Sequence, residues 1–402
     1  MAVNLPPMGD LTPIDGIVLG AAEAGVRYHD RLDLAVLLLE PGSVVGGVFT
    51  RNAFCAAPVV VARERLGGAR ALVVNSGNAN AATGARGLAD ARATCAHLAA
   101  RSGFGEQEVL PFSTGVIGEF LDMDAMRGGI DAAVANARPD GWADAARAIM
   151  TTDTAPKAVS VQGRVDGRTV RATGMVKGSG MIRPDMATML AFLGTDAALT
   201  ASAVNNLARD LAERSFNRLT IDGDTSTNDA FVVMGTGRAG GDPISGAGKA
   251  YDELLDVLTP LVVELAERTV RDGEGATKFV TIRVEQGASP AECLKVAYTI
   301  AHSPLVKTAL FAGDPNWGRF CMAIGRSVPS LEPDVVDLYL DDVQVASGGL
   351  VADTYTEAAG ADVMARDEFT VRVVLGRGTA SETVWTSDLS YEYVRINAEY
   401  RS

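Results

Sequence analysis

Short apolar runs of strand length alternate with longer amphipathic segments along this chain, and that alternation is the strongest constraint on its fold. In the first part of the chain, strand-like runs bounded by Gly, Pro and Asn lie at 17–19, 34–39, 44–50, 58–62 and 71–74. A helical pattern follows at 88–99. Strands that alternate with helices are typical of layered α/β proteins.

The same order continues to the end of the chain. We expect helices over 122–150, 200–215 and 250–270, and a hairpin over 158–176 around the favoured turn pair Asp166-Gly167. Further strands are expected at 109–112, 189–193, 230–234, 335–345, 369–374 and 382–385. No repeat of fixed period interrupts this pattern. We therefore predict a single compact α/β body of mixed sheets and helices in layers, without a linker between independent domains.

Charge and composition exclude several classes of function. The net charge of −14 argues against nucleic acid or an anionic membrane as a partner, since both need a basic face. There is no apolar run of membrane-spanning length and no export signal, so we expect a cytoplasmic protein. The four cysteines are scattered, as expected for reduced thiols. None of the three histidines has a partner at ligand spacing, so we expect no metal site.

Thr188 is the candidate nucleophile. It lies where a glycine-rich segment, beginning at Lys177, meets an apolar strand, and the preceding Ala187 is small enough to leave its carbonyl open to attack. Attack by the Thr188 hydroxyl on the Ala187 carbonyl would give an ester that water can hydrolyse. The new chain would then begin at Thr188, with an α-amine whose reference pKa is about 7.7–8.0. Such an amine can act as general base for its own hydroxyl, which removes the need for histidine.

Several segments resemble the ornithine acetyltransferase family, the glutamate N-acetyltransferases of bacterial arginine biosynthesis. The most specific is Lys-Gly-Ser-Gly-Met-Ile-Arg-Pro-Asp-Met-Ala-Thr-Met-Leu at 177–190. Other resembling segments lie at 74–80, 113–118, 151–154, 221–229, 272–278, 313–319 and 393–402, so the resemblance covers essentially the whole chain. It implies the fold of the N-terminal-nucleophile-like aminopeptidases and ornithine acetyltransferases.

The resemblance also implies roles for individual residues. Thr114 and Gly115 would form the oxyanion hole, and self-cleavage between Ala187 and Thr188 would divide the chain into an α chain of residues 1–187 and a β chain of residues 188–402 that form one intertwined body. The residues implied to bind substrate are Thr154, Lys177, Thr188, Glu274, Asn397 and Ser402. Lys177 would bind a carboxylate as a point charge, and Glu274 would be the acidic partner of an ammonium group. The family often has Thr at the position of Ser402.

The implied reaction is a ping-pong transfer of an acetyl group from N-acetylornithine to glutamate through acetyl-Thr188. Because the acetyl group comes from an amide, the transfer needs no cofactor. Use of acetyl-CoA as a second donor and feedback inhibition are not readable from the sequence, and the resemblance implies an assembly of two α and two β chains.

Two alternatives remain open from the residues alone. A hydrolase or aminopeptidase with an N-terminal nucleophile would also cleave itself but would pass the acyl group to water. A non-catalytic amino-acid-binding protein would stay one uncut chain of 41.9 kDa. The loop at 222–229 also resembles a cation-binding loop in composition, but it lacks the closing glutamate of an EF-hand, so we expect a polar turn near the active site.

Overall fold

Three mixed sheets organise the computed structural model, which describes residues 2–183 and 189–400. The first has the order β1-β2-β4-β5, the second β3-β10-β8-β7-β6, and the third β14-β13-β12-β15-β11-β16-β9. The strands are β1 (Ile17–Ala22), β2 (Leu34–Leu39), β3 (Val44–Phe49), β4 (Ala71–Asn78), β5 (Val109–Val116), β6 (Lys157–Val165), β7 (Arg168–Lys177), β8 (Leu190–Thr195), β9 (Leu219–Thr220), β10 (Ala230–Gly235), β11 (Phe279–Gly287), β12 (Asp337–Leu340), β13 (Val343–Ser347), β14 (Leu350–Val351), β15 (Glu368–Val374) and β16 (Ala380–Ser387).

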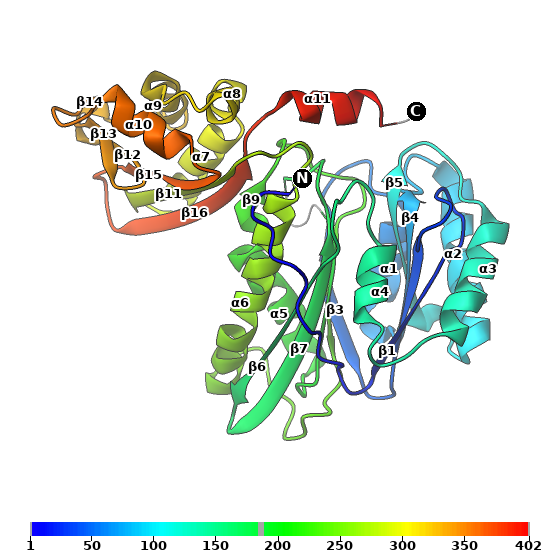
Figure 1. Ribbon diagram of the computed structural model, residues 1–402. Coiled ribbons are helices and arrows are strands. Elements are labelled where there is room, and N and C mark those ends of the chain that lie inside the picture. Colours follow the sequence, from blue (N-terminus) through cyan, green and yellow to red (C-terminus); the bar gives the residue numbers. More distant parts are fainter. Residues whose placement is uncertain (1, 184–188, 401–402) are drawn as a thin grey trace.

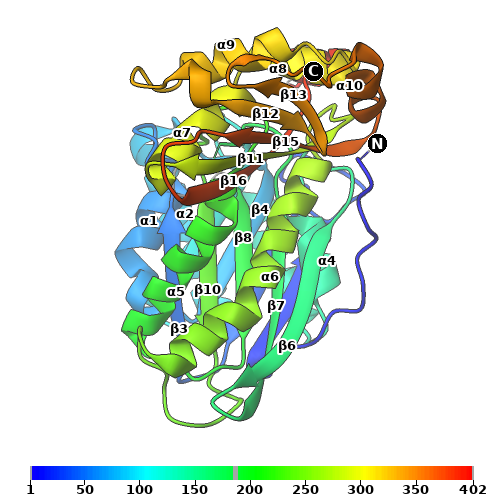
Figure 2. The same ribbon diagram turned by 90° about the vertical axis from the view of Figure 1, so that its left-hand side faces the viewer.

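Helices cover these sheets in layers. They are α1 (Ala57–Arg65), α2 (Gly84–Ser102), α3 (Met123–Ala135), α4 (Trp142–Ala148), α5 (Ala201–Arg214), α6 (Lys249–Arg271), α7 (Pro290–Ala301), α8 (Pro304–Ala312), α9 (Trp317–Gly325), α10 (Glu357–Met364) and α11 (Tyr391–Ala398). Figure 1 shows α2 and α3 outside the first sheet, and α5 and α6 outside the second. The third sheet, with α7 to α10, lies across one end of these layers (Figure 2).

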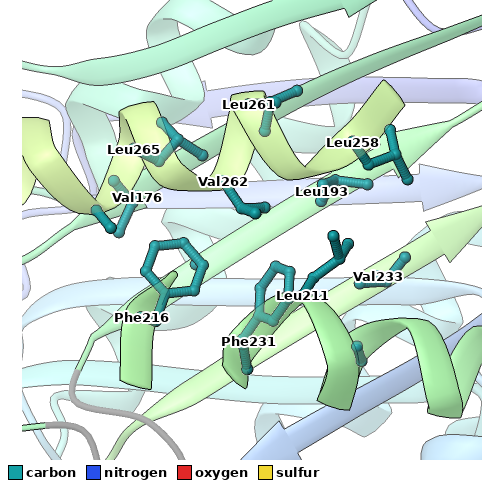
Figure 3. Close-up of a cluster of buried hydrophobic side chains, with 14 of the residues drawn as sticks. Val176, Leu193, Leu211, Phe216, Phe231, Val233, Leu258, Leu261, Val262 and Leu265 are labelled. Carbon is teal, nitrogen blue, oxygen red and sulfur yellow. The ribbon is translucent and has the colours of Figure 1, made fainter. Parts of the chain in front are cut away.

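Apolar side chains fill the space on both faces of the second sheet. Between the first and second sheets, the rings of Phe112 and Phe192 meet edge to face with centroids 5.2 Å apart. On the opposite face, α6 packs on β6 and β7, where Leu261 lies over Gly174. Phe216 and Phe231 extend this second core, as Figure 3 shows. The expected layered α/β body of mixed sheets is confirmed.

Strands from both sides of the expected cleavage position share the second sheet. β10 and β8 pair in parallel with Ala230 opposite Leu190, while β8 pairs with β7 and β10 pairs with β3. Strands β3, β6 and β7 precede position 188 and strands β8 and β10 follow it. The two parts of the chain are therefore joined by backbone hydrogen bonds within one sheet.

Three expected elements differ from the structure. Residues 58–62 lie in helix α1, because Pro58 at the first turn has a backbone angle that suits a helix start, and the helix buries Val59 and Val61 in two different apolar clusters. The expected strand at 335–345 is the two strands β12 and β13, which turn at Asp341. The expected helix at 122–150 is divided into α3 and α4 by the segment around Pro139.

None of the helices in the described residues has both the length and the hydropathy needed to cross a bilayer.

Replacing Leu261 with alanine tests the core beneath α6. The side chain is completely buried, so we expect the free energy of unfolding to fall by about 2–5 kcal/mol through lost contacts and an unfilled cavity. Urea denaturation followed by circular dichroism measures it. The matched control is Leu350→Ala on β14, where the leucine is 73% exposed and the loss should be below about 0.5 kcal/mol. Equal losses in the two variants would contradict this account of the core.

Candidate active site

A cavity of about 120 Å³ opens where the first two sheets end side by side. The last residues of β5 and β7 and the first residues of β8 lie in its wall, together with the loop before β10. Five residues that the sequence predicts for the site line it, and they come from distant parts of the chain: Thr114, Gly115, Lys177, Glu274 and Asn397. The cavity is therefore the candidate active site.

Gly115 allows an unusually close approach of two strands at this cavity. It pairs with Gly77 across the parallel strands β4 and β5, and its φ is +133°. A Cβ on Gly115 would lie 2.2 Å from the carbonyl carbon of Gly77. Any side chain would collide with that backbone, so the position requires glycine. The register of the two strands also shifts at Asn78, so their pairing is irregular at this end of the sheet.

Lys177 brings a buried cation to the same wall. It is the last residue of β7, it is 8% exposed, and its Nζ donates to Thr114 Oγ1 at 3.3 Å. Burial lowers the pKa of Lys177, and the nearby Lys157 acts in the same direction, while Asp153 and Glu274 oppose the shift. A poorly solvated ammonium beside a hydroxyl is suited to binding an anionic group of a substrate.

A second lysine, Lys157, forms a buried network with two carboxylates behind the cavity wall. Its completely buried Nζ donates to Asp153 at 2.7 Å and to Asp272 at 2.5 Å. Burial lowers the pKa of Lys157, but the two ion pairs outweigh it and raise the pKa overall. Asp153 also accepts the amide of Gly178 at 2.7 Å. The network therefore ties the segments before β6, after β7 and after α6 to one another.

Thr154 belongs to this network and does not line the cavity. Its side chain is exposed, and both its hydroxyl and its amide donate to Asp272. Thr152, two residues earlier, lies in the cavity wall instead and donates to Glu274 Oε1 at 2.8 Å. In the described structure the Thr151–Thr154 turn thus presents Thr152 to the cavity and Thr154 to the ion pairs.

The C-terminal helix α11 completes the wall. Asn397 donates to Glu274 Oε2 at 2.8 Å, and Tyr400 also lines the cavity. Figure 1 shows α11 crossing above the ends of the sheets, between the third sheet and the first. A terminal segment of this kind would ordinarily be expected to fray, but here it contributes to the site.

The polar loop of residues 221–229 holds the chain on both sides of the expected cleavage position. Asp222 accepts the amides of Met181 at 2.6 Å and Ile182 at 2.8 Å, and Thr225 donates to the Arg183 carbonyl at 3.0 Å. At the other end, the Ala230 amide donates to the Met189 carbonyl at 2.8 Å. The expectation of a polar turn near the site is confirmed.

Among the described residues, no group of three His, Cys, Asp or Glu side chains is placed to hold a metal ion.

The remaining predicted site residues, Ala187, Thr188 and Ser402, lie outside the described residues. Residue patterns alone did not single out three other lining residues, namely Thr152, Tyr400 and Asp229. Asp229 had a usable signal: it is a carboxylate directly before an apolar strand, at the end of a loop already marked by its polar composition.

The chain is similar in sequence to one family of known proteins. The sequence profile of the ArgJ family matches residues 18–402. The arginine biosynthesis bifunctional protein ArgJ of Pseudomonas syringae pv. tomato is 52% identical, and that of Pseudomonas fluorescens is 51% identical, each over 100% of both chains.

Some solved structures are also similar to this chain. The arginine biosynthesis bifunctional protein ArgJ of Bacillus halodurans is 33% identical in sequence, and the match covers 51% of this chain and 96% of that chain, with a TM-score of 0.49. The ornithine acetyltransferase of Mycobacterium tuberculosis complexed with ornithine is 36% identical, covers 44% of this chain and 96% of that chain, and has a TM-score of 0.39.

Replacing Lys157 with methionine tests the buried network. The variant leaves two carboxylates buried without their cation, so we expect a loss of about 3–5 kcal/mol in the free energy of unfolding. Chemical denaturation measures this loss. The control is Lys249→Met at the start of α6, where the side chain is 90% exposed and pairs with Glu253 only at the surface. A Lys157→Met protein as stable as that control would refute the role given to the network.

Proposed function

The chain belongs to the ArgJ family, and on that premise we propose that it transfers the acetyl group of N2-acetyl-L-ornithine to L-glutamate in arginine biosynthesis. The observation that carries the proposal is the cavity in which Thr114, Gly115 and Lys177 meet Glu274 and Asn397, beside the start of β8. The nucleophile assigned to this site is Thr188, the residue that precedes Met189.

Self-cleavage is the first step of the proposed mechanism. The Thr188 hydroxyl attacks the Ala187 carbonyl, the amide becomes an ester, and water hydrolyses that ester. Residues 1–187 become the α chain and residues 188–402 the β chain. Because β3 pairs with β10 and β7 pairs with β8, hydrogen bonds within one sheet keep the two chains together after the cut. The loop of residues 221–229 holds the backbone on one flank and Ala230, the residue after it, holds the other, which supports this step.

Acetyl transfer then uses the new terminus. The Thr188 hydroxyl attacks the acetyl carbonyl of N-acetylornithine, the α-amine takes the hydroxyl proton, and ornithine leaves after its nitrogen is protonated. Thr114 and the Gly115 amide stabilise the oxyanion; a donor in that position typically contributes about 2.7–4 kcal/mol. Glutamate then takes the acetyl group from Thr188 and restores the enzyme.

The charges of the wall suit amino-acid substrates. Lys177 binds a substrate carboxylate, and its poor solvation strengthens that pairing. Glu274 and Asn397 border the region where the substrate side chain lies. Thr154 acts through Asp272 in this arrangement, and Ser402 is assigned to the site by the family resemblance. The proposed assembly consists of two α and two β chains, as the family resemblance implies. Acetyl-CoA is proposed as a second donor, in keeping with the word bifunctional in the relatives' names.

Thr188→Ala should abolish both self-cleavage and acetyl transfer, because it removes the attacking oxygen of each step. Intact mass spectrometry is expected to give two fragments for the unaltered protein and one chain of 41.9 kDa for the variant. Thr200→Ala, a change at the N-cap of α5, is the control and should be cleaved normally. A Thr188→Ala protein that is cut or active would rule out this nucleophile.

Incubation with N-acetylornithine, with and without glutamate, separates transfer from hydrolysis. We expect N-acetylglutamate to form only when glutamate is present, because acetyl-Thr188 transfers its acetyl group to an amine and not to water. Release of acetate and ornithine at the same rate with or without glutamate would instead favour the hydrolase.

Replacing N-acetylornithine with acetyl-CoA in the same assay tests the second donor. A protein that is active with N-acetylornithine but gives no N-acetylglutamate from acetyl-CoA is monofunctional.

A further inference from the structure

The carboxyl groups at the cavity differ in how many of their oxygens already accept a hydrogen bond or an ion pair. Glu274 accepts a hydrogen bond on each oxygen, from Thr152 and from Asn397. Asp153 and Asp272, behind the wall, are paired with Lys157. Asp229 is different: it lines the cavity, and its Oδ2 is buried with no hydrogen-bond partner among the described residues.

Ser226 is the neighbour that interacts with the Asp229 carboxyl, through both its side chain and its backbone, and it lowers the pKa of that carboxyl. Asp229 is 2% exposed, and burial raises the pKa of its carboxyl well above the usual range, although the nearby Lys177 opposes the shift. Lys177 itself donates to Thr114. A buried carboxyl oxygen without a partner costs free energy in a native protein, so it calls for a partner, which a bound ligand can supply.

The position of Asp229 relative to β8 indicates which part of a ligand it meets. Asp229 directly precedes Ala230, the first residue of β10, and the Ala230 amide donates to the Met189 carbonyl. Strands β8 and β10 run in parallel from this point, side by side in Figure 2. Asp229 therefore lies next to Met189, which follows the proposed nucleophile in the chain, and not at the far wall formed by Glu274 and α11.

We propose that the free carboxyl oxygen of Asp229 contacts the amine nitrogen that gives up or receives the acetyl group. This inference rests on the proposed function. Both the donor and the acceptor carry their reacting nitrogen on the α-carbon, so one carboxyl next to Met189 serves both half-reactions. The contact orients the nitrogen relative to the acetyl carbonyl, and Glu274 remains the group nearest the distal part of the substrate.

Isotope exchange measures the two half-reactions separately. The first assay follows labelled ornithine entering N-acetylornithine, and the second follows labelled glutamate entering N-acetylglutamate, each with the cleaved protein. We expect Asp229→Asn to lower kcat/KM for both exchanges by about 100-fold, since the amide keeps the size but loses the acid. Asp229→Glu, which keeps the acid, should recover part of both rates.

Asp196→Asn is the matched control. Asp196 is also a buried acid at the end of a strand, 3% exposed and bonded to the Arg171 amide, but it does not line the cavity. We expect its exchange rates to equal those of the unaltered protein.

The outcomes separate the inference from the function on which it rests. Loss of the ornithine exchange alone would overturn the inference, because only ornithine has a distal ammonium and Asp229 would then bind that group. Unchanged rates in both exchanges, or an Asp229→Asn protein that stays uncut, would also overturn it, the last by placing the residue in chain cleavage. An unaltered protein that is cut but silent in both exchanges would instead refute the proposed function.

Discussion

The buried ammonium of Lys157, held between Asp153 and Asp272, is the interaction on which the arrangement of the site depends. Removing one partner would leave uncompensated charge in the interior, which costs far more than an exposed ion pair contributes. Because Asp153 also binds Gly178 and Asp272 also binds Thr154, this one cation sets the relative positions of three backbone segments. The cavity wall is built on those segments.

The cavity itself is a consequence of where the first two sheets end. Strands β4 and β5 run in parallel and finish together, and β7 finishes where β8 begins, so small polar residues and a lysine collect at one edge. Gly115 permits the close strand approach, and the loop of residues 221–229 holds the chain around the expected cleavage position. The third sheet and α11 then bring Glu274 and Asn397 into contact across 123 positions of sequence.

Much of the fold was predictable because hydrophobic periodicity is a local property. The strand at 34–39 has the expected bounds, and the hairpin turns at Asp166 and Gly167, both with positive φ. The segment at 58–62 misled because a run of β-branched residues favours a strand, while Pro58 suits the first turn of a helix. Five of the predicted site residues meet in one cavity, but Thr154 faces the ion pairs, since its amide and hydroxyl both donate to Asp272.

The sequence by itself determined the layered α/β class and marked the segments that form the site, because strand and helix periods and motif resemblance are readable from neighbouring residues. It also predicts Thr188 as the nucleophile, on chemistry and resemblance. Only the tertiary structure decided which of the polar side chains share the cavity and which oxygens are already satisfied. Glu274 and Asp229 look equivalent as acids in the sequence, yet one is fully hydrogen-bonded and the other has a free oxygen. That difference depends on partners from distant segments, which no local pattern encodes.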